Sequence, residues 1–166
     1  RVPGMNLPGT PFTLHLAWEH VRDIRLARTN LAAFRGEAAR DPWAAEPPGS
    51  LLAGLHGHDV LVMFVESYGR TALDNTRYAP TIRATLASAE PDLAASGLTA
   101  RSAFLVSPVV GGQSWLAHAT LLSGLDIANQ ARFRALVNSP RHTLVRLAEG
   151  SGWHTAAVVP AIRRAW

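Results

Sequence analysis

A run of six apolar residues, VLVMFV at positions 60–65, ends abruptly on a carboxylate, Glu66. The run has the length of a strand and shows no alternation, which is typical of a parallel strand covered on both faces. Two more runs of strand length follow, SAFLVS at 102–107 and HTAAVV at 154–159. These three runs constrain the fold most, because a buried parallel strand needs neighbouring strands and covering helices.

Segments with helical signals separate the three runs. Pro80 precedes a helix that we expect at 81–89, a Gly pair opens one at 114–123, and Gly150 closes one at 143–150. The order of strands and helices predicts an α/β fold, with a mostly parallel sheet flanked by helices. The sequence starts without Met and stops at Trp166 in the middle of a pattern, so we expect a piece of a longer protein and an incomplete sheet.

The first third of the chain has a different pattern. Apolar residues recur at helical spacing over 13–40, which predicts an amphipathic helix, and 41–50 contains three Pro and reads as a linker. We therefore divide the chain into an N-terminal helix with its Pro-rich linker, 1–55, and an α/β part, 56–166, which the family resemblance given below makes the N-terminal portion of a catalytic domain.

Composition excludes several classes of function. The 166 residues are 48% hydrophobic and 17% charged, which suits a chain that buries a core. The basic residues are all Arg and are scattered, so the net charge of +4 does not indicate a nucleic-acid binder. There is no Cys, which removes disulfides, thiolate metal sites and a Cys nucleophile. No apolar run reaches the ~18 residues that a membrane helix needs.

The chemistry gathers where the expected strands end. Ser114 follows Glu66 by 48 residues, about one strand–helix–strand unit, and ligands of open α/β sheets bind beyond the carboxyl ends of strands. A hydroxyl at a helix N-terminus lies among free N–H groups, which favour an anion and the ionised hydroxyl. Gly111 and Gly112 let a tetrahedral group approach the main chain, so Gly112 is a candidate substrate contact.

A divalent metal fits these two oxygen ligands. A carboxylate from Glu66 and an alkoxide from Ser114 suit Mn, Mg or Zn, and such a metal would lower the pKa of the hydroxyl. Simpler interpretations stay open beside this one. Taken alone, Ser114 is more simply a helix cap, and Glu66 a capping or salt-bridged carboxylate paired with Arg70; the pairing of the two residues favours the metal site.

Two residues of the expected 114–123 helix are further substrate-binding candidates. His118 lies one turn after Ser114 on the same face, where it would contact the transferred group or donate a proton; the alternative is packing or solvent contact. Trp115 borders the turn and would form a wall of the pocket, and the alternative is a place in the core.

The two stretches VLVMFVESYGRTALDN and GGQSWLAHATLLSG, followed by TLVRLAEGSGWHTAAVVPA, resemble the alkaline phosphatase/sulfatase superfamily. The resemblance covers about 57–166 and is closest to its membrane-anchored branch: lipoteichoic acid synthase-like enzymes, phosphoglycerol transferases and phosphoethanolamine transferases. It implies an alkaline phosphatase-like sheet, a divalent metal, a phospholipid head group or other phosphate or sulfate ester as substrate, and a periplasmic or extracytoplasmic domain at the cell membrane.

Carried over to this sequence, the resemblance makes Glu66 a metal ligand and Ser114 both metal ligand and covalent nucleophile. It also places Arg164 and Trp166 near the substrate. The implied reaction is metal-dependent transfer of a phosphoglycerol- or phosphoethanolamine-type group, or hydrolysis of a phosphoester or sulfoester.

The sequence departs from the family in two ways. The family completes its site with a later Asp-His pair and another His, which 125–166 does not present, so we expect a piece of a longer protein that is inactive alone. Ser114 also lacks the C/S-x-P-x-R context of formylglycine sulfatases. The alternatives are a non-catalytic binding or scaffold module, with Ser114 only a helix cap, and a soluble phosphatase or phosphomutase of the same superfamily.

Overall fold

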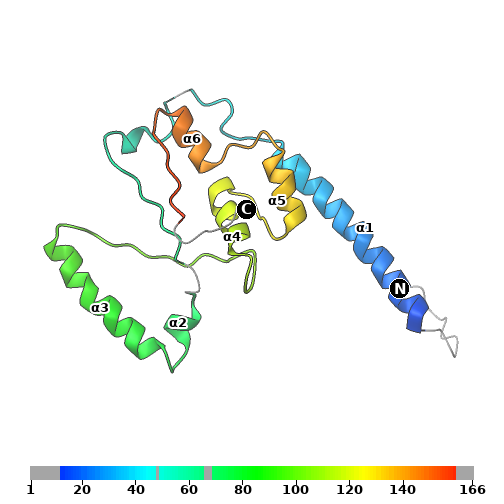
Figure 1. Cartoon of the computed structure of the whole chain (residues 1–166), viewed down its shortest axis with the longest axis horizontal. Coiled ribbons are helices and arrows are strands. Elements are labelled where there is room, and N and C mark those ends of the chain that lie inside the picture. The colour runs from blue at the N-terminus through cyan, green and yellow to red at the C-terminus, as the bar shows by residue number, and fades with distance from the viewer. Residues whose placement is uncertain (1–11, 48, 66–68, 160–166) are drawn as a thin grey trace.

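The computed structural model describes residues 12–47, 49–65 and 69–159, and within them the chain is helical (Figure 1). One long helix leads into a group of short helices, and a helical excursion in the middle of the chain extends to one side. The elements in chain order are α1 (Phe12–Ala38), the 3-10 turn η1 (Ala53–Leu55), α2 (Thr71–Asp74), α3 (Ala79–Ala95), α4 (Ser114–Ser123), α5 (Gln130–Val137) and α6 (Leu144–Gly150).

Helix α1 confirms that the expected 13–40 segment is helical, but only its last turns are covered and most of its apolar residues are exposed. Phe34 and Ala38 are buried, at 3% and 0% exposure, where α1 packs on α5. The earlier turns project from the rest of the molecule (Figure 1), and Trp18 is 64% exposed there. Since the helix is about 40 Å long at 1.5 Å per residue, most of it lies outside the core.

The core forms where the end of α1 packs on α5 and α5 in turn contacts α4. Trp115 of α4 and Phe133 of α5 meet edge to face, with ring centroids 4.7 Å apart and an interplanar angle of 85°. This geometry is favourable for aromatic pairs. The loop between α4 and α5 supplies two more apolar side chains to the same cluster. The buried members of this core are Phe34, Ala38, Leu116, Leu125, Ile127 and Leu136.

The predicted α/β fold with a mostly parallel sheet is wrong for the described residues, which contain six α-helices and no strand. The three apolar runs, 60–65, 102–107 and 154–159, have no regular secondary structure. Their main-chain groups form no hydrogen bond with any residue that the structure describes. Their side chains also stay in solvent: Leu61, Leu105 and Val158 are 79%, 82% and 87% exposed.

The error has a physical cause. A parallel strand is stabilised by a crossover helix that returns across the sheet and covers its face. Here the segment between the first two runs forms α2 and α3, which pack on each other and contact no other helix in the described part of the chain. Figure 1 shows α3 extending away from α4. The runs therefore lack the neighbour that would pair their main chains, and no crossover helix covers them.

The helices expected from the sequence are largely confirmed. The helix at 114–123 has the bounds of α4, and the one expected at 143–150 is α6, with Thr143 as its N-cap. The helix expected at 81–89 is longer in the structure, because α3 continues through Pro91 to Ala95.

Candidate functional site

Ser114 is the first residue of α4 and follows a tight left-handed turn. Gly111, Gly112 and Gln113 have φ of 64°, 65° and 53°, and Gln113 occupies the N-cap position without a side-chain cap bond. Left-handed backbone costs a residue with a Cβ about 1–2 kcal/mol, whereas Gly adopts it freely. The two glycines therefore permit the reversal that presents the first turn of α4, and Gln113 completes it under strain.

The approach to this turn is open. A Cβ built on Gly111 or Gly112 would meet no atom within 4 Å. The first turn of α4 contains no acidic residue, so no carboxylate of its own opposes the positive end of the helix dipole. The two glycines therefore lie in open space, while one N–H of the first turn, that of Leu116, already donates to the carbonyl of Gln113 at 2.9 Å.

One aromatic contact brings the first apolar run to this helix. The rings of Phe64 and His118 stack, with centroids 4.0 Å apart and an interplanar angle of 27°. His118 lies one turn after Ser114 on α4, so the end of the 60–65 run lies against the helix that begins at Ser114. The two stretches that sequence reasoning paired are thus neighbours in the structure, although no sheet joins them.

A second contact links the segment after the first run to the second run. The guanidinium of Arg70 lies 4.9 Å from the centroid of the Phe104 ring, which is within the range of a cation–π interaction. Arg70 also forms an ion pair with Asp74 at 2.5 Å. The interpretation that pairs Arg70 with Glu66 concerns a residue outside the described part of the chain.

Three of the predicted site residues cannot be placed. Glu66, Arg164 and Trp166 all lie outside the described residues. Among those described, Trp115 packs against Phe133 at the edge of the core, as its alternative interpretation expected, and Gly112 lies in the open turn. The roles assigned to these residues stay predictions.

The described residues do not supply a complete metal site. Within 12–47, 49–65 and 69–159, no group of three or more His, Asp or Glu side chains converges as ligands would. In the same ranges, no helix has the length and apolar character to cross a bilayer.

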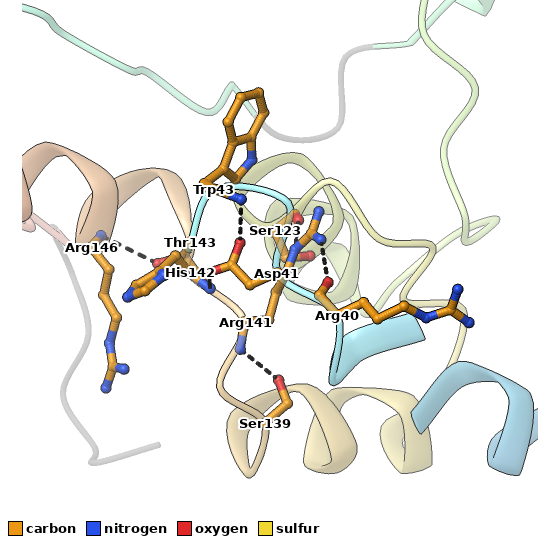
Figure 2. A network of polar contacts seen from close by, with 9 residues as sticks. All are labelled: Arg40, Asp41, Trp43, Ser123, Ser139, Arg141, His142, Thr143 and Arg146. Carbon is orange, nitrogen blue, oxygen red and sulfur yellow. Dashed lines mark hydrogen bonds and ion pairs between the residues drawn. The ribbon is translucent and has the colours of Figure 1, made fainter. Parts of the chain in front are cut away.

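The structure contains a polar cluster that sequence reasoning missed, and we call it the clamp (Figure 2). The Asp41 carboxylate accepts hydrogen bonds from the main-chain N–H groups of Trp43, at 3.1 Å, and His142, at 3.2 Å, and contacts the Nδ1 atom of the His142 ring. Arg141 donates from Nη1 to the carbonyl of Arg40 at 3.0 Å and from Nε to that of Ser123 at 3.1 Å. The clamp joins the end of α1 to the segment before α6.

Asp41 is charged and well satisfied within the clamp. Its side chain is 4% exposed, and this burial acts to raise the pKa of the carboxyl group. The hydrogen bonds from Trp43 and from His142 outweigh burial and hold the pKa of Asp41 below its ordinary value. The only local signal in the sequence is the Asp-Pro pair at the start of the linker, and nothing near it indicates His142 as the partner.

The side chain of His142 is 41% exposed, and Asp41 orients its ring through a contact with Nδ1. Such an arrangement fixes a tautomer, but no nucleophilic side chain among the described residues hydrogen-bonds to this ring. We therefore interpret the clamp as structural and keep the start of α4 as the candidate site.

Comparison with protein-family models, with curated proteins and with solved structures returns no match to this chain.

Proposed function

We propose that the start of α4 is a site for covalent phospho-group chemistry, in which Ser114 attacks a phosphate ester. The observation that carries the proposal is the stacking of Phe64 on His118, which puts the run preceding Glu66 against the helix that begins at Ser114. The open Gly111–Gly112 turn supports it, because a tetrahedral group needs close access to the main chain.

The proposed reaction proceeds in two displacements. The Ser114 oxygen forms a bond to phosphorus, the bond from phosphorus to the leaving alcohol breaks, and the hydroxyl proton passes to that alcohol. The phosphorus on Ser114, which retains its second ester group when the substrate is a diester, is then attacked by an acceptor alcohol or by water; the bond to the Ser114 oxygen breaks, and the proton of the acceptor restores the hydroxyl. Main-chain N–H groups at the start of α4 stabilise the charge that develops on the phosphoryl oxygens. We assign the assistance of these proton transfers to His118, which lies one turn after Ser114 on α4.

The proposed substrate is a phosphodiester such as a phospholipid head group at a cell membrane, and the group passed on is of the phosphoglycerol or phosphoethanolamine type. A sulfate ester is the second substrate class for the same geometry. A divalent metal, Mn, Mg or Zn, belongs to the proposal with Glu66 and Ser114 as ligands, and it would supply charge neutralisation. The described residues do not complete such a ligand set, so no step here depends on the metal.

The test is loss of activity on removal of one hydroxyl. In the natural protein, we expect Ser114→Ala to lower hydrolysis of bis(p-nitrophenyl) phosphate, assayed with Mn²⁺, at least about a thousandfold, since the nucleophile is gone. The matched control is Ser107→Ala, which removes an exposed hydroxyl that only bonds to Val109 in the preceding loop. The control should stay within about twofold of wild type.

Mass spectrometry supplies the second measurement. Quenched reactions should carry a p-nitrophenyl phosphoryl adduct on the peptide containing Ser114, and this adduct should be missing in Ser114→Ala. Normal turnover in Ser114→Ala would overturn the proposal. It would leave Ser114 with a structural role at the start of α4, as in the non-catalytic binding or scaffold alternative.

A further inference from the structure

A groove lies between the end of α1 and α5, where these two helices pack on each other (Figure 1). Its volume is about 440 Å³, which is within the range of small-molecule sites, roughly 300–1,000 Å³. The groove combines apolar groups with guanidinium groups. Its apolar lining consists of Leu31, Ala39, Ala131, Ala135 and Pro140.

Two arginines line this groove from opposite helices, Arg35 from α1 and Arg134 from α5. Among the residues that the structure describes, neither guanidinium forms an ion pair, a hydrogen bond or a ring contact. Arg70 and Arg132, by contrast, each form an ion pair with an aspartate. The groove therefore presents two cations whose hydrogen-bond donors are open to a ligand.

The helix ends do not need these guanidinium groups as caps. Arg35 and Arg134 lie in the last turns of α1 and α5, where a cation is favourable beside the helix dipole. The carbonyls there already have partners in the chain. The N–H of Ala39 donates to the carbonyl of Arg35 at 2.9 Å, and Nδ2 of Asn138 donates to that of Arg134 at 2.8 Å. Both guanidinium groups thus remain available at the groove.

The region around the groove carries positive charge that no carboxylate offsets locally. The stretches 24–36 and 127–148 contain seven Arg and no Asp or Glu. Of the carboxylates closest in sequence to the lining, Asp41 belongs to the clamp, Asp126 forms an ion pair, and Glu37 lines a different depression. Such a field attracts anions, so the charge of the groove selects an anionic ligand.

The number of charges indicates the class of anion. A phosphate monoester carries about 1.5 to 2 negative charges on one group at neutral pH, and it accepts paired hydrogen bonds from guanidinium groups. One phosphate group therefore matches both Arg35 and Arg134, whereas a monocarboxylate carries a single charge. The apolar lining favours a ligand whose phosphate is attached to a small apolar body.

We propose that the groove between α1 and α5 binds a phosphate monoester with a small apolar body. The phosphate pairs with Arg35 and Arg134, and the body lies against the apolar lining. The groove shares no residue with the start of α4, so this site is independent of the proposed chemistry at Ser114.

Binding of phenyl phosphate to the natural protein, measured by calorimetry, tests the proposal. We expect binding that weakens as the salt concentration rises, because the charges lie near the surface. Arg35→Gln and Arg134→Gln should each raise the dissociation constant at least about threefold, and the double variant at least about tenfold. The matched control is Arg146→Gln, which removes one exposed charge of the same basic region outside the groove. The control should stay within about twofold of wild type.

A further variant leaves both arginines in place. Ala131→Glu introduces a carboxylate into the groove at an exposed position in the first turn of α5, where an acidic residue suits the helix dipole. The new carboxylate should pair with the guanidinium groups and weaken binding of phenyl phosphate at least about tenfold. Circular dichroism should show that the variant unfolds as wild type does.

Nuclear magnetic resonance of protein labelled with ¹⁵N only at arginine locates the contact. Phenyl phosphate should shift the Nε–H signals of Arg35 and Arg134, which are assigned by their loss in the two Gln variants. These shifts should persist in Ser114→Ala, which separates this site from the start of α4.

Two other ligands test the class of anion. Benzoate carries one charge and inorganic phosphate has no apolar body, so each should bind at least about threefold more weakly than phenyl phosphate. Equal binding of either ligand would overturn the assigned class. An equal loss of affinity in Arg146→Gln, no binding of phenyl phosphate, or unshifted signals of Arg35 and Arg134 would overturn the site itself.

Discussion

Two regions of this molecule have similar apolar content and opposite fates. In the clamped region, formed by the end of α1 with α4, α5 and the segment before α6, the side chains of Leu116 and Ile127 are fully buried. The open region is formed by α2, α3 and the first two apolar runs. Among its described apolar residues, Ala79 alone is buried. The difference is that long-range contacts close the first region.

The clamped region shows what such contacts do. Arg141 and His142 bond to residues 101 positions earlier, which brings α1 back to the segment before α6. In the open region, α2 and α3, which together span 71–95, contact each other and no other helix in the described part of the chain. Apolar residues are buried when distant segments are held together, so the content of a run alone does not determine its burial.

The largest expected effect comes from truncating the core. Leu116→Ala should lower the free energy of unfolding by about 2–5 kcal/mol, because Leu116 is 0% exposed and its loss leaves a cavity. The paired variant in the open region, Leu86→Ala, should change it by no more than about 0.5 kcal/mol. Urea unfolding followed by circular dichroism measures both. Equal effects would show that the two regions fold as one unit.

The next effect concerns the clamp. Asp41→Asn should lower the free energy of unfolding by about 1–3 kcal/mol at neutral pH, because the carboxylate accepts from two N–H groups and contacts the ring of His142. The control is Asp74→Asn, whose carboxylate is 49% exposed and pairs with Arg70. Surface pairs contribute about 0–1 kcal/mol, so the control should fall in that range.

The pH dependence sharpens the same comparison. The pKa of Asp41 is lower in the folded chain than its ordinary value, so its contribution is complete above about pH 4 and is lost as pH falls through the folded pKa. Wild type should therefore lose stability on acidification more steeply than Asp41→Asn. Asp74→Asn should retain the wild-type slope, and a parallel response of wild type and Asp41→Asn would contradict the assigned role.

The smallest effect compares two glycines that follow helices. Gly124 after α4 and Gly97 after α3 have φ of 68° and 72°, so Ala at either position costs about 1 kcal/mol. Gly124→Ala should shift the main unfolding transition by that amount, because α4 belongs to the core. Gly97→Ala should leave the main transition in place and only increase hydrogen exchange within α3. A shift of the main transition in Gly97→Ala would tie α3 to the core.

Local signals in the sequence were sufficient for several helices. Gly124 and the Gly pair at 111–112 bound α4 at the expected residues, and Thr143 caps α6. These signals act within a few residues, where sequence and geometry are directly coupled. Helix α5 was not predicted, although Asn129 caps it through a bond from the Arg132 N–H. Its eight residues, QARFRALV, are too few to show a clear helical period.

The apolar runs failed as strand predictions because pairing is a property of two segments. The composition of 60–65 indicates a segment that is stable when covered, and it contains no information about which segment covers it. The same limit applies to the candidate site. The GGQSW stretch was sufficient to predict Ser114 at a helix start. The approach of Phe64 to His118 depends instead on how the chain between them folds back, which no local pattern specifies. The clamp was missed for the same reason, since Asp41 and His142 are 101 residues apart.

The clamp also determines how this chain would respond to a pulling force. Tension applied between α1 and the segment after α6 passes directly from Asp41 to His142, and the residues between them carry none of it. The α2–α3 excursion and the first two runs therefore form a mechanically hidden loop. When the clamp breaks and the contacts of the loop yield, the 101-residue separation corresponds to about 340 Å of extended chain. A few hydrogen bonds around one buried carboxylate thus shield most of the contour length of the molecule from load.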